Sequence, residues 1–464
     1  MKNTVNECWT DRTEKHLIPS LFSFITLRQE RFGALIFNPY LGTEEELDPI
    51  EAYIVSLCNG NNSCRQVETA VQRRFGLPLS ESWRRISDTV KKLLQMCALT
   101  FRDGEEPARP RLPDTAVFPE DGPYLSAPKN IIWDVTYACN LHCPHCLTAS
   151  GRAQKGELDT NQALSLIDRL ADAKVFSLSL VGGEPFLRPD ILVLLEHIST
   201  ANMRADIATN GVELPERILR GLRDLPVFQV QVSIDGIGEQ HDQFRGRKGA
   251  FDAACCTVQR LREEGIAVSL STTVTAENVD TLNQIIDLAL ELDCSGFKAI
   301  PFLPAGRGRD NADWLKLDSK EHLQLSQTLV EQSRRLEGRL NISTETCFPF
   351  LLEPPPAETY SNGPMGCSAG YDILSIGADG TCYPCPFLHD FPLGNLMNSS
   401  LRYLWREAPV LQTLRTLQKQ DIGEPCKNCP YSPLLCRGGC RAAAYLECGD
   451  LQAGDPTCFQ PIIG

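Results

Sequence analysis

The 464-residue chain lacks the features that mark membrane-spanning and secreted proteins. It contains no run of 18 or more apolar residues, so the sequence predicts no membrane-spanning helix. Its first sixteen residues, MKNTVNECWTDRTEKH, have no apolar segment of the kind found in secretory signals. We therefore expect a cytoplasmic protein without a membrane partner.

The chain also lacks an excess of positive charge, because its formal net charge is −14. Proteins that bind nucleic acids neutralise phosphates with Lys and Arg, so the sequence predicts no nucleic-acid partner. Disulfides do not persist in reducing cytosol, yet the chain has 20 cysteines. Nine lie between Cys367 and Cys458 and three within the stretch YACNLHCPHC, a clustering that indicates metal binding.

Composition divides the chain into four stretches. Residues 1–103 contain two strand-like runs, LFSFITL and FGALIFN, and then three segments of helical periodicity, which together suggest a winged-helix (α+β) domain. The helical segments are LDPIEAYIVSLCNG, SCRQVETAVQRRFG and ESWRRISDTVKKLLQMCAL. Residues 104–126 are acidic and rich in proline, as in a linker.

In residues 127–345, β-branched apolar runs alternate with helical patterns such as TNQALSLIDRLADA. Six strands buried on both faces predict a parallel α/β sheet curled into a partial (β/α)6 barrel, with its chemistry at the carboxyl ends of the strands. The runs are IIWDVTY, FSLSLVG, RADIAT, VFQVQVSI, VSLSTTV and FKAIPFL. Residues 346–464 have little regular pattern and many cysteines, so we expect metal sites rather than an apolar core to stabilise them.

YACNLHCPHC follows the first barrel strand and carries the spacing C-x3-C-x2-C. Thiolates select iron–sulfur clusters, zinc or copper(I). A structural zinc site is one interpretation, but such sites normally have four protein ligands. Three cysteines instead favour a four-iron cluster in which one iron has no protein ligand and is open to a substrate.

Small and polar residues recur where the other expected strands end. They form the segments GGEP, TNG, SIDG, RGRKGAFD and PFLPAGRG. Each alone is compatible with an ordinary strand-to-helix turn. Taken in order after the cysteine motif, they predict a polar ligand lying across the barrel mouth, which the glycines would allow the backbone to approach closely.

CNLHCPHC and GGEP resemble the signature of the radical S-adenosylmethionine (radical SAM) superfamily, over residues 130–345. The resemblance implies that SAM chelates the open iron, that one electron cleaves its S–C5′ bond, and that a 5′-deoxyadenosyl radical abstracts hydrogen from the substrate. It implies no catalytic residue beyond cluster and SAM. The implied cluster ligands are Cys139, Cys143 and Cys146. The implied SAM contacts are Gly182, Gly183 and Glu184 at the methionine amino end, and Asn210, Ser233 and Arg245 at the ribose or carboxylate.

CRGGC and YPCPF in the tail resemble the SPASM extension of peptide-modifying radical enzymes, which holds two auxiliary iron–sulfur clusters. The resemblance implies an outer cluster and an inner cluster. The implied ligands are Cys426, Cys429, Cys436 and Cys458 for the outer, and Cys367, Cys385 and Cys440 for the inner. The family often has a cysteine shortly before Cys367, where this chain has Ser361, so Cys347, Cys382 or the substrate remain alternatives for the fourth inner ligand. Two zinc sites are the other interpretation of the tail.

FGALIFN and LDPIEAYIVSLCNG resemble in pattern the RiPP recognition element, a winged-helix domain that holds the leader of a ribosomally made precursor peptide by strand addition. The 13 Lys and Arg of residues 1–103 are balanced by 13 Asp and Glu, which does not favour DNA binding. A purely structural cap is the alternative.

DVTYACNLHCPHCLTASG, VQVSIDG and CPFLHDFPLGN are similar to the mycofactocin maturase family of radical SAM/SPASM enzymes. That family oxidatively decarboxylates and crosslinks a peptide, so the resemblance implies an oxidoreductase that matures a precursor peptide and draws electrons from a flavodoxin- or ferredoxin-type reductant. Oxidative decarboxylation of tetrapyrrole side chains is a second interpretation. A non-catalytic iron–sulfur protein for electron transfer or binding is a third.

Overall fold

The structure is a computed structural model, and it describes residues 17–102, 124–344, 348–352, 366–432 and 435–463. The chain divides into two compact units, residues 1–126 and residues 127–464. Most of the expected linker, and Cys347, lie outside the described residues. No helix among the described residues is long and apolar enough to cross a membrane.

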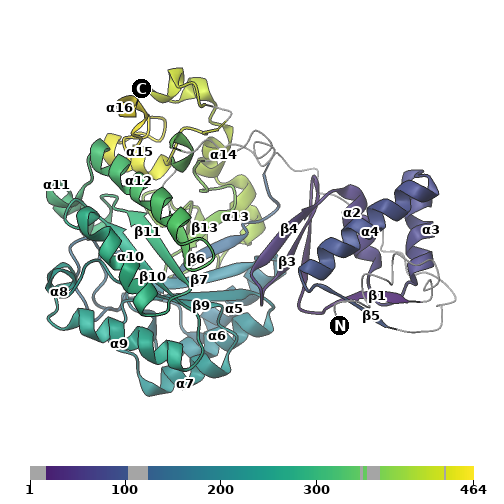
Figure 1. Cartoon of the computed structure of the whole chain (residues 1–464), viewed down its shortest axis with the longest axis horizontal. Coiled ribbons are helices and arrows are strands. Elements are labelled where there is room, and N and C mark those ends of the chain that lie inside the picture. Colours follow the sequence, from purple (N-terminus) through teal and green to yellow (C-terminus); the bar gives the residue numbers. More distant parts are fainter. Residues whose placement is uncertain (1–16, 103–123, 345–347, 353–365, 433–434, 464) are drawn as a thin grey trace. The chain divides into compact units, whose positions relative to one another are not determined.

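The first unit contains a three-stranded antiparallel sheet of order β2-β3-β4, followed by three helices (Figure 1). A separate antiparallel pair joins β1 to β5. The strands are β1 (Ile18–Leu21), β2 (Thr26–Glu30), β3 (Gly33–Asn38), β4 (Thr43–Leu47) and β5 (Leu99–Arg102). The helices are α2 (Pro49–Leu57), α3 (Cys64–Phe75) and α4 (Leu79–Gln95). The expected run LFSFITL is wrong as a single strand, because a turn divides it between β1 and β2.

Capping residues and the spacing of apolar residues explain why these three helices form. Asp48 caps α2 by accepting hydrogen bonds from the backbone N–H groups of Ile50 and Glu51. Ser63 caps α3 in the same way. Helix α4 buries Ile86, Val90 and Leu93, spaced by four and three residues, so one face of the helix packs into the core of this unit.

The second unit is built on one sheet of order β12-β11-β10-β9-β8-β7-β6-β13-β14-β15. From β12 through β13 every neighbouring pair is parallel. Among the described residues the two ends of the row are not paired with each other, so the sheet is an open, partial barrel. The six expected strands are confirmed as β6 (Asn130–Thr136), β7 (Ser177–Gly182), β8 (Arg204–Thr209), β9 (Gln229–Ser233), β10 (Val268–Val274) and β11 (Gly296–Pro301). The sequence did not predict β12 (Asn341–Thr344).

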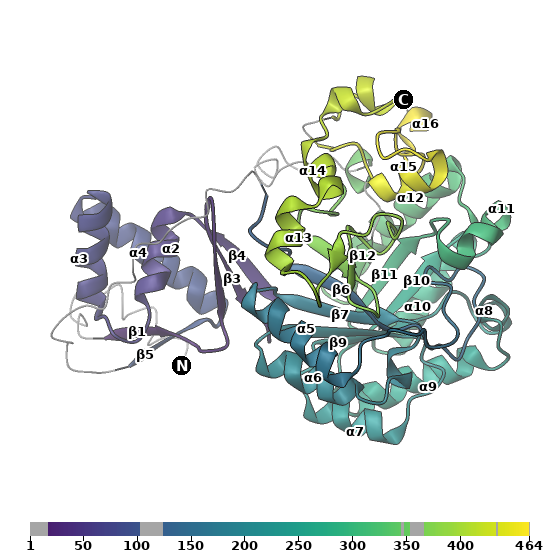
Figure 2. The same cartoon turned by 180° about the vertical axis from the view of Figure 1, so that it is seen from behind.

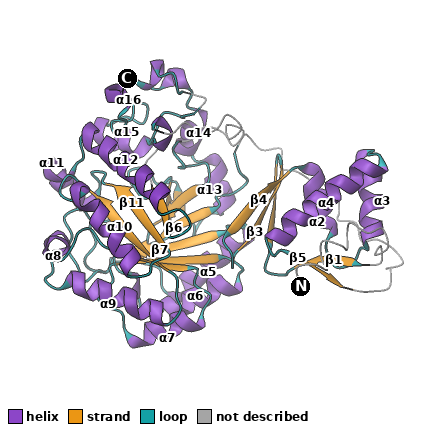
Figure 3. Ribbon diagram, viewed as in Figure 1, coloured by secondary structure: helices purple, strands orange, loops and turns teal. Residues whose placement is uncertain are grey.

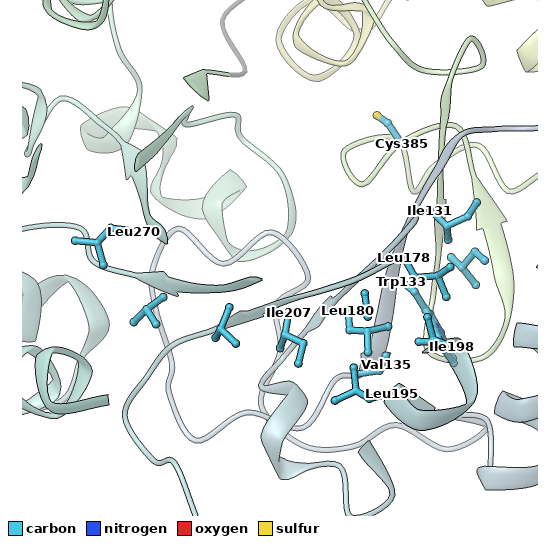
Figure 4. Packing of buried hydrophobic residues seen from close by; sticks show 14 of the residues in the cluster. Ile131, Trp133, Val135, Leu178, Leu180, Leu195, Ile198, Ile207, Leu270 and Cys385 are labelled. Atoms are coloured by element: carbon cyan, nitrogen blue, oxygen red, sulfur yellow. The ribbon is translucent and has the colours of Figure 1, made fainter. Parts of the chain in front are cut away.

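Helices cover one face of this sheet, with α5, α6, α7 and α9 on the same side in Figures 1 and 2. Trp133, Leu180 and Ile207 point into the core between sheet and helices (Figure 4). The helices of this region are α5 (Thr160–Asp172), α6 (Ile191–Thr200), α7 (Glu216–Asp224), α8 (Glu239–Arg245), α9 (Ala250–Glu263), α10 (Leu282–Glu291), α11 (Ala312–Leu315) and α12 (Ser319–Arg335).

The expectation that all six strands are buried on both faces is wrong for β8 and β9. In β8 and β9, buried residues alternate with half-exposed ones, and the half-exposed positions are mostly polar, such as Asp206, Gln229 and Gln231. Alternation along a strand sends these side chains to the face opposite the helices. The inner face of the partial barrel therefore carries polar groups.

The C-terminal region is more regular than expected (Figure 3). β13 (Ile373–Ile376) pairs with β6, and β14 (Thr381–Tyr383) and β15 (Gly394–Asn395) continue the sheet. The expectation of little apolar core is wrong, because Leu404, Trp405 and Leu411 are buried in the core that the barrel helices share. The helices here are α13 (Leu401–Glu407), α14 (Pro409–Thr416), α15 (Arg441–Cys448) and α16 (Gln460–Ile463).

Candidate functional site

The three cysteines of YACNLHCPHC lie in the loop that follows β6, at the carboxyl end of that strand. They pack in one small apolar group with Leu141 and Val212. Burial raises the pKa of the Cys139 thiol to about 11. Metal binding would therefore have to displace protons, since thiolates are the ligands.

Each of these sulfurs faces an N–H donor from a different segment. The side-chain amide of Asn210 donates to Sγ of Cys139 at 3.9 Å. The guanidinium of Arg245 donates to Sγ of Cys143 at 3.9 Å, and the backbone N–H of Ser150 donates to Sγ of Cys146 at 3.4 Å. Donors of this kind stabilise cluster thiolates and tune their potential, so the surroundings fit an iron–sulfur cluster.

Arg307, after β11, holds the cysteine loop by its backbone. Its guanidinium donates to the carbonyl oxygens of Cys143 at 2.7 Å and Ser150 at 2.6 Å, and its own N–H donates to the carbonyl of Cys146 at 3.0 Å. A Cβ at Gly306 would lie 2.0 Å from the carbonyl oxygen of Leu147, so only glycine fits there. This role of Arg307 was not predicted from the segment PFLPAGRG, in which the flanking glycines were the available signal.

The glycines of GGEP allow a close approach to the cysteine loop. A Cβ at Gly182 would lie 2.4 Å from the carbonyl oxygen of Thr136, and one at Gly183 would lie 2.2 Å from that of Ala138. The N–H of Gly183 donates to Thr136 at 2.8 Å. The expected close approach to a ligand is therefore, in this structure, an approach to the backbone that precedes Cys139.

Glu184 joins the ends of two neighbouring strands. Its carboxylate accepts hydrogen bonds from the hydroxyl of Thr209 and the backbone N–H of Asn210, both at 2.8 Å, and from the N–H of Phe186 at 3.1 Å. Burial raises the pKa of Glu184 to about 7, although these hydrogen bonds oppose the shift. The carboxylate has lone pairs left over, so it can still accept a bond from an ammonium group.

A buried ion pair lies on the other side of the cysteine loop. Arg245 of α8 contacts Asp235, just after β9, with nitrogen and oxygen 2.5 Å apart. Burial alone would lower the pKa of Arg245. The nearby Asp235 and the sulfur of Cys143 together have a larger effect and raise that pKa, so the guanidinium stays charged. Asp235 was not predicted as a site residue, although it lies in the segment SIDG. Ser233 ends β9 two residues earlier and is paired in register with Ser271.

His145 lies inside the cysteine loop and stacks on Phe244, with ring centroids 4.4 Å apart. Its Nε2 atom is 3.8 Å from the carboxylate of Asp235. Burial lowers its pKa well below the ordinary value, so the ring is neutral. These contacts hold the His145 ring in place beside the cysteines.

Four of the tail cysteines gather near the C-terminus. Cys436 and Cys458 pack with Phe348 and Phe459, and burial raises their pKa values to about 11 and about 12. Cys458 interacts electrostatically with Cys426 and Cys436, as neighbouring thiols do. The structure thus brings together residues expected in the outer set.

The cysteines expected in the inner set pack against the large core of the second unit. Cys440 precedes α15 and accepts a hydrogen bond from the N–H of Ala443 at 3.5 Å. Cys382 is different, since it is fully buried on β14 among apolar side chains, and burial raises its pKa strongly.

Within the described ranges, no three His, Cys, Asp or Glu side chains converge as the ligands of a single metal ion do.

Comparisons with known proteins agree with this chemistry. Residues 133–289 match the Radical SAM superfamily, and residues 367–430 match the SPASM iron–sulfur cluster-binding domain. Mycofactocin maturase MftC of Mycobacterium tuberculosis is 33% identical over 341 residues, which cover 72% of this chain and 84% of that protein. An AdoMet-dependent heme synthase of Methanosarcina barkeri is 30% identical over 355 residues, which cover 72% of this chain and 97% of that protein.

Solved structures extend the similarity in fold. Streptococcus suis SuiB bound to S-adenosylmethionine aligns with a TM-score of 0.70 and 19% identity, over 95% of this chain and 99% of SuiB. The enzyme anSMEcpe with bound AdoMet aligns with a TM-score of 0.56 and 20% identity, over 71% of this chain and 93% of its own. The chain therefore belongs to the family of radical SAM/SPASM enzymes that includes mycofactocin maturase, with a [4Fe–4S] cluster, SAM and auxiliary iron–sulfur clusters as cofactors.

Proposed function

We propose that this enzyme matures a ribosomally made precursor peptide by abstracting a hydrogen atom from it, which leads to oxidative decarboxylation or to an intrapeptide crosslink. The observation that carries the proposal is the extent of the fold match. SuiB, which has been solved with its precursor peptide SuiA, aligns over 94% of this chain in that complex. So long an alignment must include much of the first unit, whereas the sequence match to the heme synthase covers 72% of the chain.

In this proposal Cys139, Cys143 and Cys146 hold the cluster that, when bound with SAM, supplies the 5′-deoxyadenosyl radical. The neighbouring residues hold and orient SAM. Glu184 accepts a hydrogen bond from the methionine ammonium group while Gly182 and Gly183 keep that backbone close to the cysteine loop. Asn210, Ser233 and Arg245 contact the ribose or the carboxylate.

The SPASM region contributes the auxiliary clusters. We assign the outer cluster to Cys426, Cys429, Cys436 and Cys458, and the inner cluster to Cys367, Cys385 and Cys440. Cys347, Cys382 and the substrate itself remain the alternatives for the fourth inner ligand.

The first unit would hold the leader of the precursor as a RiPP recognition element of winged-helix type. In the described part of the chain, β4 pairs with β3 on one side only, so its other edge is open to an added strand. Glu45 and Glu46 are exposed along that strand. A leader with basic residues beside its docking segment would complement their charge.

Oxidative decarboxylation of a tetrapyrrole is the second candidate function. It is supported by the 30% identity to the M. barkeri heme synthase over nearly the whole of that protein. A tetrapyrrole, however, needs no second docking site. A peptide substrate therefore gives the first unit a role, namely leader binding, whereas a porphyrin substrate gives it none. The non-catalytic alternative has no support from these relatives, which are enzymes by name.

The test uses the reconstituted full-length enzyme with SAM and dithionite under anaerobic conditions. The genes beside this one are first read for a short open reading frame. One sample then receives a synthetic peptide that such a frame encodes, and another receives Fe-coproporphyrin III. Mass spectrometry follows both substrates and 5′-deoxyadenosine. Modified peptide supports the proposal, whereas an unmodified peptide together with a decarboxylated porphyrin would assign the second function.

A further inference from the structure

Asp134 is a carboxyl group on the inner face of the barrel that neither the cluster nor the SAM contacts account for. Its neighbours Trp133 and Val135 point into the core beneath the helices (Figure 4). Alternation along β6 therefore sends Asp134 to the opposite face of the sheet, the face on which the polar residues of β8 and β9 lie.

The carboxyl of Asp134 is buried without a full set of partners. The residue is 4% exposed, and its Oδ2 atom has no hydrogen-bond partner among the described residues. Leaving a buried carboxyl oxygen unpaired is costly, so the position requires an explanation. Asp206, also on the inner face, differs because Arg204 donates to both of its oxygens at 3.0–3.2 Å.

Asp134 also lies between the GGEP segment of the proposed SAM site and the SPASM region. A β-bulge follows it in the pairing with β7, and bulges next to active sites commonly re-aim a side chain. A Cβ at Gly182 would lie 3.2 Å from the Cα of Asp134, so the residue is beside the GGEP segment. On the other side it interacts electrostatically with Tyr383, which is two residues before Cys385.

We propose that Asp134 is the catalytic base of the peptide reaction, accepting a proton from the substrate group that bonds to the carbon radical. The inference rests on the proposed function and deepens it toward crosslink formation. A substrate C–H bond loses a hydrogen atom to the 5′-deoxyadenosyl radical, an X–H bond loses its proton to the Asp134 carboxylate, and a C–X bond forms. One electron remains, and an oxidant of the iron–sulfur class, as carried by the SPASM region, accepts it.

The raised pKa of Asp134 suits the role of a base. Burial raises its pKa to about 7, near the pH at which a base works best. The titratable side chains that interact with it are Tyr137, just beyond β6, and Tyr383 on β14, and burial raises the pKa of both. Its register partner on β7 is Val181, and on β13 the neighbouring inward residue is Ser375, which is uncharged. Glu184, in the adjacent GGEP segment, also has a pKa of about 7, but three hydrogen bonds hold its carboxylate, whereas Oδ2 of Asp134 has no hydrogen-bond partner among the described residues.

The test compares Asp134→Asn with wild-type enzyme and with Asp206→Asn, which removes an inward carboxylate that is already paired. The synthetic precursor peptide is the substrate, and the readout is the ratio of peptide product to 5′-deoxyadenosine between pH 6 and pH 8.5. In wild-type enzyme the ratio should rise through about pH 7. Asp134→Asn should lower it at least tenfold at pH 8 and remove the pH dependence, whereas Asp206→Asn should keep the wild-type profile.

A second variant guards against misfolding. Asp134→Glu retains a carboxyl and should retain a pH-dependent ratio with a shifted midpoint. An unchanged ratio and profile in Asp134→Asn would overturn the assignment of the base while leaving the peptide function intact. Absence of any peptide product from wild-type enzyme would instead overturn the proposed function, and this inference with it.

Discussion

The guanidinium of Arg307 donates a hydrogen bond to the backbone carbonyl oxygen of Cys143, 2.7 Å away. The two residues are far apart in sequence, and the contact fixes the cysteine loop from the opposite side of the barrel mouth. A charge-assisted hydrogen bond of this kind contributes about 1.5–3 kcal/mol, so Arg307 has a substantial effect on the order of the loop.

Arg307→Ala should therefore impair assembly of the radical SAM cluster. We expect reconstituted enzyme to lose the iron and the electron paramagnetic resonance signal of that cluster first, with SAM cleavage falling about tenfold or more, since about 1.4 kcal/mol corresponds to a factor of ten. Arg309→Ala is the matched control, because Arg309 is exposed and contacts Asp390 rather than the loop. Equal iron content and SAM cleavage in the two variants would contradict this role.

Iron analysis tests the cysteine sets. Reconstituted wild-type enzyme should be brown and contain roughly three four-iron clusters, or about twelve irons per chain. Replacing Cys139, Cys143 and Cys146 by Ala should remove about four irons, preserve the auxiliary clusters and abolish 5′-deoxyadenosine formation. About four irons in the wild type, or zinc in their place, would refute the assignment of the tail.

The stability of the protein should depend on pH through Asp134. Its pKa is raised from 3.8 to about 7, so the unfolded state ionises first and stability falls as pH rises toward and through 7. The difference amounts to about 4 kcal/mol at most. The side chain of Asn in Asp134→Asn cannot ionise. The melting temperature of this variant minus that of the wild type should therefore increase as the pH is raised from 6 to 8.5. Glu184 titrates in both proteins and cancels in the comparison; a constant difference would contradict the buried, ionisable carboxyl.

Charge reversal on β4 tests leader docking. Glu45→Lys with Glu46→Lys should weaken binding of a fluorescent precursor peptide about tenfold or more if the leader is basic where it adds to this edge. A control with the same change in charge is Glu196→Lys with Glu331→Lys, since both of these glutamates are exposed on helices of the second unit. The same affinity in both double variants would exclude docking at this strand.

Removal of the first unit is the broader test of the same idea. A chain without residues 1–103 keeps every proposed ligand of the radical cluster, so SAM cleavage should continue. Modification of the full-length precursor should fall steeply, because leader docking raises the local concentration of the core peptide. Equal modification by the truncated and complete chains would favour the tetrapyrrole function.

Local patterns in the sequence predicted the parts of the fold that local physics determines. The six barrel strands and the helices α2, α3 and α4 followed from periodicity and capping, and the cysteine motif followed from thiolate chemistry. Strand β4 was missed because TEEEL has three glutamates, which are uncommon in strands, and only its pairing with β3 makes it one. The short strand β13 becomes regular only by pairing with β6.

The missed site residues have a common physical reason. Arg307, Asp235 and Asp134 act through contacts with segments distant in sequence, which no local pattern reveals. In the sequence Arg307 cannot be distinguished from other loop arginines, because its contacts with the cysteine loop appear only in the folded chain. Asp134 looks like an ordinary polar residue in an apolar run, and its importance appears only when the other side of the strand is seen to be buried.

The most direct test of the central claim follows a hydrogen atom. Wild-type enzyme is incubated anaerobically with SAM, dithionite and a perdeuterated synthetic precursor peptide, and 5′-deoxyadenosine is analysed by mass spectrometry. We predict that 5′-deoxyadenosine gains deuterium while the peptide loses mass by crosslinking or decarboxylation. Unlabelled 5′-deoxyadenosine together with a peptide of unchanged mass would contradict the account.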